Sequence, residues 1–201
     1  MENTLRWGIL GASKFALEFM LPAMQLAKRT KCVALATSNY QHAKAFLRIN
    51  PEIVVYEDYE LLLQDSKIDA VYIPLPNHLH VQWSRKAIQA GKHVLCEKPI
   101  ALHADEIDEL IKMRNTSGML LAEAYMIVHH PQWQYAKELL QSGVIGDLKQ
   151  VDGWRSWPTR APSNHFLCPQ VTGCGHEKSC TAFFTLQTHA LRQRAYYWPP
   201  T

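Results

Sequence analysis

Short apolar segments alternate with helical patterns along the first 122 residues, and this alternation limits the possible folds more than any other feature of the sequence. The segments predicted to be strands are 5–10, 32–37, 53–56, 70–73, 93–96 and 119–122. Strands separated by helices need crossover connections, and such connections produce a parallel sheet with helices on both faces. We therefore predict an α/β fold with a doubly wound parallel sheet.

Helical periodicity fills the connections between these strands. The first connection, 14–29, has apolar residues at helical spacing that include Phe19 and Leu26, and Pro22 is expected to bend this helix. The other predicted helices are 41–49, 59–64, 80–90, 105–114 and 131–142. After the last of these, residues 148–152 are predicted to form the first strand of a new unit.

The composition is that of an ordinary soluble protein, with 47% hydrophobic and 19% charged residues. No apolar run approaches the ~20 residues that a membrane span needs, and the N-terminus enters a strand without a basic and then apolar leader. Five cysteines, an odd number without framework spacing, fit a reducing compartment. We expect a cytoplasmic protein with no membrane partner.

The composition changes abruptly after Gly153. Residues 1–153 contain 16 Lys and Arg against 17 Asp and Glu, whereas residues 154–201 contain 5 against 1. This tail has no strand alternation and only one segment, 179–195, that could be helical, so we predict that it is poorly ordered. It contains no recognisable nucleic-acid module, and nucleic acid is not an expected partner. One hypothesis is that the tail is an altered reading of a longer gene.

No metal site is expected. The tail places three cysteines and two histidines close together in sequence, but it lacks the Cys-x-x-Cys spacing of structural zinc sites. These residues are His165, Cys168, Cys174, His176 and Cys180. The adjacent pair His129 and His130 also fails as a ligand set, because neighbours on an extended chain point apart.

The first predicted strand ends in Gly11, Ala12, Ser13, Lys14 and Phe15, where a dinucleotide-binding fingerprint belongs. A glycine permits the tight turn from strand to helix, and the N–H groups at the start of that helix can bind a phosphate. Ser13 stands where a second glycine is usual, and its hydroxyl can itself bond a phosphate oxygen. The loop and the strands around it predict a Rossmann-type domain over residues 1–122.

The end of the second predicted strand indicates the cofactor type. An acidic residue here would bond the ribose 2′-hydroxyl of NAD, yet the chain has no Asp or Glu between Glu18 and Glu52. Ser38 and Asn39 stand there instead, and Lys14 and Lys44 are available as counter-charges for a 2′-phosphate. This pattern favours NADP over NAD; the alternative is that these are ordinary surface residues.

The loop after the fourth predicted strand carries Pro74, Pro76, Asn77 and His80 as candidate cofactor contacts. Two prolines stiffen a turn, and Asn77 is expected to cap the following helix. In a doubly wound sheet this loop faces the cofactor, so a cap role does not exclude a cofactor contact. His78 and His80 are more often surface or hydrogen-bonded core histidines than catalytic groups.

The fifth predicted strand runs directly into Glu97, Lys98 and Pro99. The carboxyl edge of a parallel sheet is where ligands bind, so Lys98 is a candidate proton donor or electrostatic clamp. The alternative is a solvated loop lysine. The flanking loops favour the functional interpretation.

Residues 7–16, 73–80, 91–99 and 122–132 resemble the Gfo/Idh/MocA family of NAD(P)-dependent oxidoreductases, most specifically in the run Gly-Lys-His-Val-Leu-Cys-Glu-Lys-Pro. The resemblance covers about residues 5–153. It implies a Rossmann domain followed by the truncated start of an α/β substrate domain at 123–153, with 154–201 as an aberrant tail. It also implies that Lys98 is the active-site lysine, that Glu97 and Lys98 face the cofactor, and that the bond before Pro99 is cis.

The activity implied by the resemblance is reversible hydride transfer between NADP(H), or NAD(H), and a CH–OH or C=O carbon of a sugar, polyol or dihydrodiol. Lys98 would stabilise the substrate oxygen and exchange its proton, and Tyr125 is a second catalytic candidate whose role could equally be packing. The family also implies a homo-oligomer formed through the substrate domain. The alternative function is a nucleotide-binding remnant or sensor that lacks its substrate domain.

Overall fold

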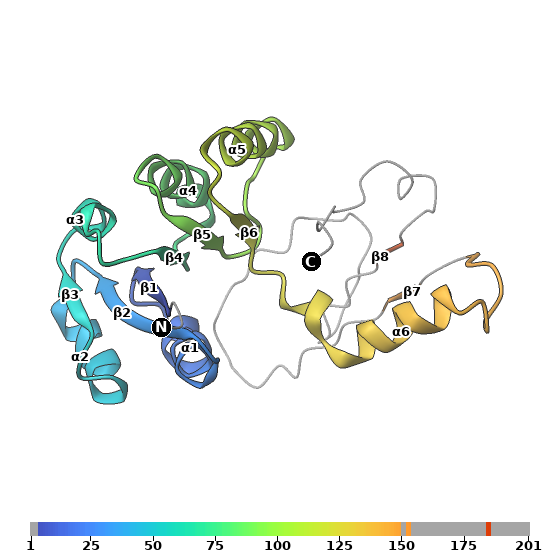
Figure 1. Cartoon of the computed structure of the whole chain (residues 1–201), viewed down its shortest axis with the longest axis horizontal. Coiled ribbons are helices and arrows are strands. Elements are labelled where there is room, and N and C mark those ends of the chain that lie inside the picture. Colours follow the sequence, from blue (N-terminus) through green and yellow to red (C-terminus); the bar gives the residue numbers. More distant parts are fainter. Residues whose placement is uncertain (1–3, 150–151, 154–183, 186–201) are drawn as a thin grey trace, which may run out of the picture. The chain divides into compact units, whose positions relative to one another are not determined.

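The structure is a computed structural model that describes residues 4–149, 152–153 and 184–185. The chain divides into two compact units, 1–128 and 129–201 (Figure 1). The first unit holds the sheet and the candidate site, and each unit is described by itself.

The first unit is built on a six-stranded parallel sheet in the order β3-β2-β1-β4-β5-β6. The strands are β1 (Leu5–Leu10), β2 (Thr30–Ala36), β3 (Val54–Tyr56), β4 (Ala70–Ile73), β5 (His93–Cys96) and β6 (Leu121–Glu123). The order reverses between β1 and β4, which is the arrangement of a dinucleotide-binding sheet. The predicted doubly wound parallel sheet is confirmed.

Helices cover both faces of this sheet (Figure 1). On one face, α3 (Tyr59–Gln64) and α4 (His80–Gln89) bury Leu62, Leu63, Ala87 and Ile88 against the strands, and α5 (Ala104–Ser117) packs beside α4. On the other face, α1 (Leu21–Leu26) and α2 (Tyr40–Ile49) bury Leu21, Met24, Ala43 and Phe46. Burial of apolar surface on both faces explains why the central strands are almost wholly apolar.

The first helix is shorter than predicted and is not a regular α-helix along its whole length. Residues 14–26 are helical, and Ala16–Met20 form a π-helical stretch, η1, in which the Leu21 N–H donates to Ala16 O five residues earlier. Pro22, at the start of α1, has no N–H to donate to the preceding turn, so the regular helical ladder is interrupted there.

The π-helical stretch changes which face of this helix is buried. Phe19 is 57% exposed and Leu26 is 86% exposed, whereas Ala16, Leu21 and Met24 form the buried face. An extra residue per turn shifts the following side chains around the helix axis relative to a regular α-helix. Phe19 and Leu26, whose helical spacing predicted the helix, therefore do not lie on its buried face.

Several element ends differ from their predictions; strand partners set the ends of the strands, and a glycine sets the end of one helix. Thr30 pairs with Leu5, so β2 begins two residues earlier than predicted and ends at Ala36. The sixth strand starts at Leu121, where its pairing with Val94 begins. The helix predicted at 105–114 extends over Ala104–Ser117 and ends at Gly118, which has a positive φ.

The second unit contains α6 (Pro131–Gln141) and an antiparallel pair of short strands, β7 (Asp152–Gly153) and β8 (Phe184–Thr185). The predicted strand at 148–152 was wrong at Leu148 and Lys149, which lie outside any strand. Within 179–195, the one segment of the tail that could be helical from its sequence, Phe184 and Thr185 are instead a strand that pairs with β7.

Several predictions about the tail lie outside the described residues. They concern the order of 154–201, its origin and its cysteines, and the predicted domain limits 1–122, 123–153 and 154–201 also stay predictions.

Short 3-10 turns connect two of the elements to their neighbours. One turn, η2 (Asn77–Leu79), precedes α4, and another, η3 (Met126–His129), follows β6. Within the described ranges, no helix has the length and apolar character to cross a membrane.

Candidate functional site

The sheet order brings the candidate residues to one edge. The strands are parallel, so their carboxyl ends meet at the same side, and the strand order reverses between β1 and β4, which is the point where open α/β sheets bind their ligands. Gly11, Ser38, Pro74, Lys98 and Tyr125 each follow one of these strands within a few residues. Gly11 and Tyr125, which lie more than one hundred positions apart in the sequence, both follow strands that end at this edge.

Gly11 forms the turn at the end of β1. Its φ is +103°, a conformation that residues with a Cβ rarely adopt, and a Cβ built on it would lie 2.8 Å from Cδ2 of Leu75. Its N–H donates to Ala36 O at 2.9 Å, which ties the turn to the end of β2. The backbone can pass close to a ligand here because no side chain intervenes.

Ser13 caps the helix that follows the turn. Its Oγ accepts a hydrogen bond from the Ala16 N–H at 3.0 Å, and its carbonyl accepts from the Leu17 N–H at 3.1 Å. The hydroxyl hydrogen stays available for a phosphate oxygen, as the sequence suggested. Ala12 is half-buried, and Lys14 and Phe15 form the first helical turn, whose N–H groups an α-helix leaves free.

The end of β2 presents polar but no acidic side chains. Ser38 is exposed, and Asn39 caps α2 by accepting from the Gln41 N–H at 2.9 Å. Lys44 is exposed on α2, and Lys14 is exposed with a 3.6 Å contact to Glu18 on the next turn. An ion pair between such exposed groups is weak, so Lys14 can turn to an anionic ligand at little cost.

The loop after β4 differs from its prediction at Asn77. This residue begins η2 and does not cap α4, whose N-cap residue is Leu79 and has no side-chain cap. The prediction of Asn77 as the helix cap was therefore wrong, because a 3-10 turn separates it from the α-helix. Pro74 is half-buried, and Pro76 and Asn77 are exposed.

His80 lies apart from the exposed members of that loop. Its ring is fully buried, and both ring nitrogens lie 2.7 Å from backbone carbonyl oxygens, Nδ1 from Pro99 O and Nε2 from Leu75 O. A ring with both nitrogens engaged in this way has no polar atom left for a ligand. Its role as a cofactor contact stays a prediction.

Two residues of β4 hold the Glu97 to Pro99 turn through hydrogen bonds to Glu97. The Glu97 N–H donates to Ile73 O at 3.0 Å, and the buried Tyr72 hydroxyl donates to Glu97 Oε1 at 2.8 Å. The bond between Lys98 and Pro99 is cis, as the resemblance implied. The Lys98 side chain is exposed, and in the described part of the chain it forms no ion pair.

The end of β6 and the residues that follow it are hydrogen-bonded to the same turn and to the strand before it. Glu123 accepts a hydrogen bond from the Ile100 N–H at 2.9 Å, and the Ala124 N–H donates to Cys96 O at 2.7 Å. These contacts carry the chain alongside β5 to Tyr125, whose side chain is 51% exposed. Tyr125 therefore directly follows Ala124, which is hydrogen-bonded to Cys96, the residue before Glu97.

Burial keeps two titratable groups beside the turn, the Cys96 thiol and the Tyr72 hydroxyl, neutral. It raises the pKa of the Cys96 thiol to about 12. Burial and, after it, the hydrogen bond to Glu97 raise the pKa of Tyr72 well above its ordinary range. The Cys96 thiol is therefore not a nucleophile at neutral pH.

Three residues that hold this edge were missed by sequence reasoning. Tyr72 and Glu123 support the Lys98 turn, and the Tyr59 hydroxyl lies 3.8 Å from where a Gly11 Cβ would be. Burial raises the pKa of Tyr59, and its ring packs edge-on against Trp83. Each lies inside an ordinary strand or helix pattern, so no local signal distinguishes it from a core residue.

Within the described ranges, no group of three or more His, Cys, Asp or Glu side chains could hold a metal ion. The residues present suit a dinucleotide instead. Gly11 lets the backbone approach a ligand, and a helix begins immediately after it with a capping serine.

A parallel sheet wound in this order, with a glycine turn after its first strand, defines a dinucleotide-binding domain of the Rossmann class. Residues 5–125 match the family model described as oxidoreductase family, NAD-binding Rossmann fold. The chain belongs to this family, the Gfo/Idh/MocA oxidoreductases, as its resemblance implied.

Relatives of known activity reduce or oxidise sugars and diols. A dTDP-3,4-didehydro-2,6-dideoxy-alpha-D-glucose 3-reductase from Actinomadura kijaniata is 38% identical over 148 residues, 73% of this chain and 44% of that protein. A trans-1,2-dihydrobenzene-1,2-diol dehydrogenase from Xenopus tropicalis is 32% identical over 147 residues, with the same two coverages of 73% and 44%.

A solved structure agrees with this relation. The 3-ketoreductase from Actinomadura kijaniata in complex with NADP and TDP-benzene has a TM-score of 0.67 and 36% identity, covering 72% of this chain and 44% of that one. The chain thus spans less than half the length of each of these three proteins.

Proposed function

We propose that this chain is the dinucleotide-binding part of an NADP(H)-dependent oxidoreductase that interconverts a carbinol and a carbonyl of a sugar, polyol or dihydrodiol. The observation that carries the proposal is the meeting of the Gly11 turn and the Lys98 turn at one sheet edge, through the adjacent strands β1, β4 and β5. The names of the relatives support the substrate class.

The proposed cofactor contacts follow the edge from strand to strand. The Gly11 turn, with Ala12, Ser13, Lys14 and Phe15, binds the pyrophosphate through backbone N–H groups and the Ser13 hydroxyl. The ribose end lies at Ser38 and Asn39, and the loop at Pro74, Pro76 and Asn77 lines the nicotinamide side. The further proposed contacts are Glu97 and Lys98, to which the structure adds Tyr59 through its proximity to Gly11.

The nicotinamide, when bound, supplies or accepts the hydride. Lys98 holds its ammonium at the substrate oxygen, where it stabilises negative charge and exchanges the proton. Glu97, fixed by Tyr72, sets the direction of the turn, and Tyr125 is the second proposed contact on the substrate side. Exposure of the Lys98 side chain leaves it free to reach a ligand at this edge.

We infer a preference for NADP from the end of β2. An acidic residue that would repel a 2′-phosphate is missing from this position, and the cations Lys14 and Lys44 are exposed on the adjoining helices. A 2′-phosphate gains attraction from such cations and loses it as salt screens them. The preference should therefore weaken at high ionic strength.

Binding and turnover of the full chain test the proposal together. We expect NADPH to bind at least tenfold more tightly than NADH in calorimetry at low salt. Reduction of 3-keto sugars and oxidation of polyols and trans-dihydrodiols are then followed by NADPH absorbance. Failure to bind either dinucleotide contradicts the proposal.

The variant Lys98→Met separates dinucleotide binding from turnover. This variant should lose turnover by at least about a hundredfold, because Lys98 acts on the substrate oxygen. Its NADPH affinity should fall by no more than about tenfold, because Lys98 is only one of several proposed cofactor contacts. Binding without any turnover by the unaltered chain favours the remnant or sensor that the sequence left open. Undiminished turnover in the variant removes Lys98 from the proposed chemistry.

A further inference from the structure

His80 is the one fully buried histidine of the described residues, and it lies between two parts of the candidate site. Nδ1 is 2.7 Å from Pro99 O, and Nε2 is 2.7 Å from Leu75 O. Both distances are short for a contact between ring nitrogen and carbonyl oxygen. Both partners are also pure acceptors.

Two acceptors require two donors. A neutral imidazole has one N–H and one lone pair, so it can satisfy only one carbonyl and turns its lone pair toward the other. A lone pair facing a carbonyl oxygen at this distance in a buried site is repulsive and leaves a polar atom unpaired. Hydrogen bonds to both carbonyls at once therefore need a hydrogen on each ring nitrogen.

The charge that this implies is opposed and supported by different groups. Complete burial of the ring opposes a cation, and so does the positive end of the helix dipole, because His80 begins α4. The two carbonyl dipoles favour it, and the carboxylates Glu97 and Glu123 bond the N–H groups on either side of Pro99.

These carbonyls belong to two functional segments. Leu75 lies against Gly11, because its Cδ2 would be 2.8 Å from a Cβ at that position. Pro99 directly follows Lys98 through the cis bond. A single ring thus joins the loop that backs the phosphate turn to the turn that carries the lysine.

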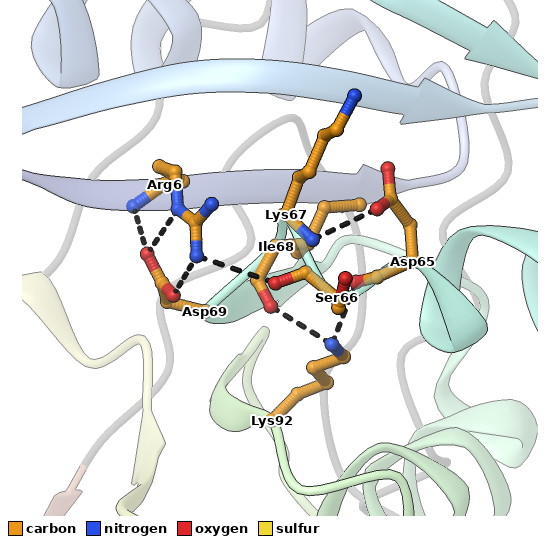
Figure 2. Close-up of polar contacts among 7 residues, drawn as sticks. All are labelled: Arg6, Asp65, Ser66, Lys67, Ile68, Asp69 and Lys92. Atoms are coloured by element: carbon orange, nitrogen blue, oxygen red, sulfur yellow. Dashed lines mark hydrogen bonds and ion pairs between the residues drawn. The ribbon is translucent and has the colours of Figure 1, made fainter.

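The opposite edge of the sheet offers a comparison (Figure 2). Lys92, whose side chain is buried, donates from Nζ to Asp65 O and Ile68 O at 2.8 Å each. It is also a buried cation that bridges two backbone carbonyls, but it lies before β5, at the amino edge. Its bridge stabilises the fold without touching the candidate site.

We propose that His80 is a positioning residue, a doubly protonated ring that fixes the Lys98 turn relative to the Leu75 loop and so aligns Lys98 with a dinucleotide at Gly11. The alignment of Lys98 with a dinucleotide rests on the proposed function, whereas the protonation of both ring nitrogens does not. No other described side chain bonds both segments.

The state of the ring is tested in the unaltered chain. Nitrogen NMR of histidine-labelled protein distinguishes a ring nitrogen that carries a proton from one that does not. We expect both nitrogens of His80 to be protonated at neutral pH, with proton couplings to each. A single unprotonated nitrogen in the folded chain overturns the proposal, and this measurement needs no variant.

The positioning role is tested with a matched pair of variants. His80→Gln removes one of the two contacts that the ring makes with carbonyl oxygens at the carboxyl edge. Lys92→Met removes both contacts that Lys92 makes with carbonyl oxygens at the amino edge. Where both variants are folded, we expect about tenfold weaker NADPH binding in His80→Gln and a change below twofold in Lys92→Met. His78→Ala, an exposed neighbour on η2, controls for local disturbance.

The possible outcomes separate the two proposals. Equal losses of affinity in the His80 and Lys92 variants, or none in either, contradict positioning by His80. If His80→Gln does not fold, the ring measurement alone decides. No NADPH binding by the unaltered chain contradicts the proposed function instead.

Discussion

At the residue scale, Gly11 meets two constraints at once. Its φ of +103° strains any residue with a Cβ, and the neighbouring Leu75 side chain occupies the place where that Cβ would go. Gly91 shares the positive φ, but nothing lies within 4 Å of the place where its Cβ would be. The pair therefore separates backbone strain from close packing.

We expect Gly11→Ala to lower the free energy of unfolding by about 2–4 kcal/mol, since strain and overpacking add. Gly91→Ala should cost about 1–2 kcal/mol, from strain alone. Urea unfolding measures both. NADPH affinity should fall at least tenfold in the first variant and stay unchanged in the second, and equal effects on binding would argue against a cofactor role for the Gly11 turn.

Most candidate site residues could be read from the sequence, because a glycine after a strand and a lysine at a strand end have local meaning. Tyr72 and Glu123 could not, since their role depends on which strands are neighbours. His80 was recognised as a candidate, but its burial between two loops depends on where β4 and β5 end.

At the element scale, the strands were easier to predict than the first helix. Strand patterns are short and apolar, and a buried parallel strand tolerates no slip of its apolar run. The helix after β1 contains apolar residues on more than one side, and the π-helical stretch before Pro22 decides which of them are buried. That outcome depends on packing against β2, which a local pattern does not contain.

An ion pair joins β1 to the start of β4 at the amino edge (Figure 2). Asp69 accepts from Nε of Arg6 at 2.8 Å and from its NH2 group at 2.6 Å, and also from the Arg6 backbone N–H at 2.9 Å. The hydrogen bonds from Arg6 hold the pKa of Asp69 below its usual range. Asp65, bonded by Tyr56, has a lowered pKa as well.

These shifts predict how stability depends on acid. A lowered pKa means that the unfolded chain binds protons more readily, so the stabilisation is full above about pH 4 and is lost as pH falls below it. Asp69→Asn should lower the urea midpoint at neutral pH and flatten its decline in acid. Asp147→Asn, which removes a pair between almost fully exposed side chains, should change neither. An unchanged acid limb in Asp69→Asn would refute the assignment.

At the scale of the whole molecule, the first unit contains the apolar core. Every buried apolar side chain of the described residues lies between Ile9 and Leu110, and α6 has none. All six strands of the parallel sheet lie in this unit as well. The first unit therefore has the burial that independent folding needs.

We expect a chain ending at Val128 to fold cooperatively, with a thermal midpoint within a few degrees of the full chain, because no described core residue is lost. Its NADPH affinity should match that of the full chain within about twofold. Circular dichroism and calorimetry measure the two quantities. A truncated chain that does not fold would show that residues 129–201 contribute to the stability of the first unit.

The sequence by itself determined the class of fold and indicated the Gly11 turn and Lys98 as candidates, because apolar period, glycine and strand ends are local signals. Tertiary structure alone decided the buried face of the first helix, the partners Tyr72 and Glu123, and the two-carbonyl contact of His80. The physical reason is that these features arise where separate strands end beside one another, and strand adjacency is a property of the folded sheet.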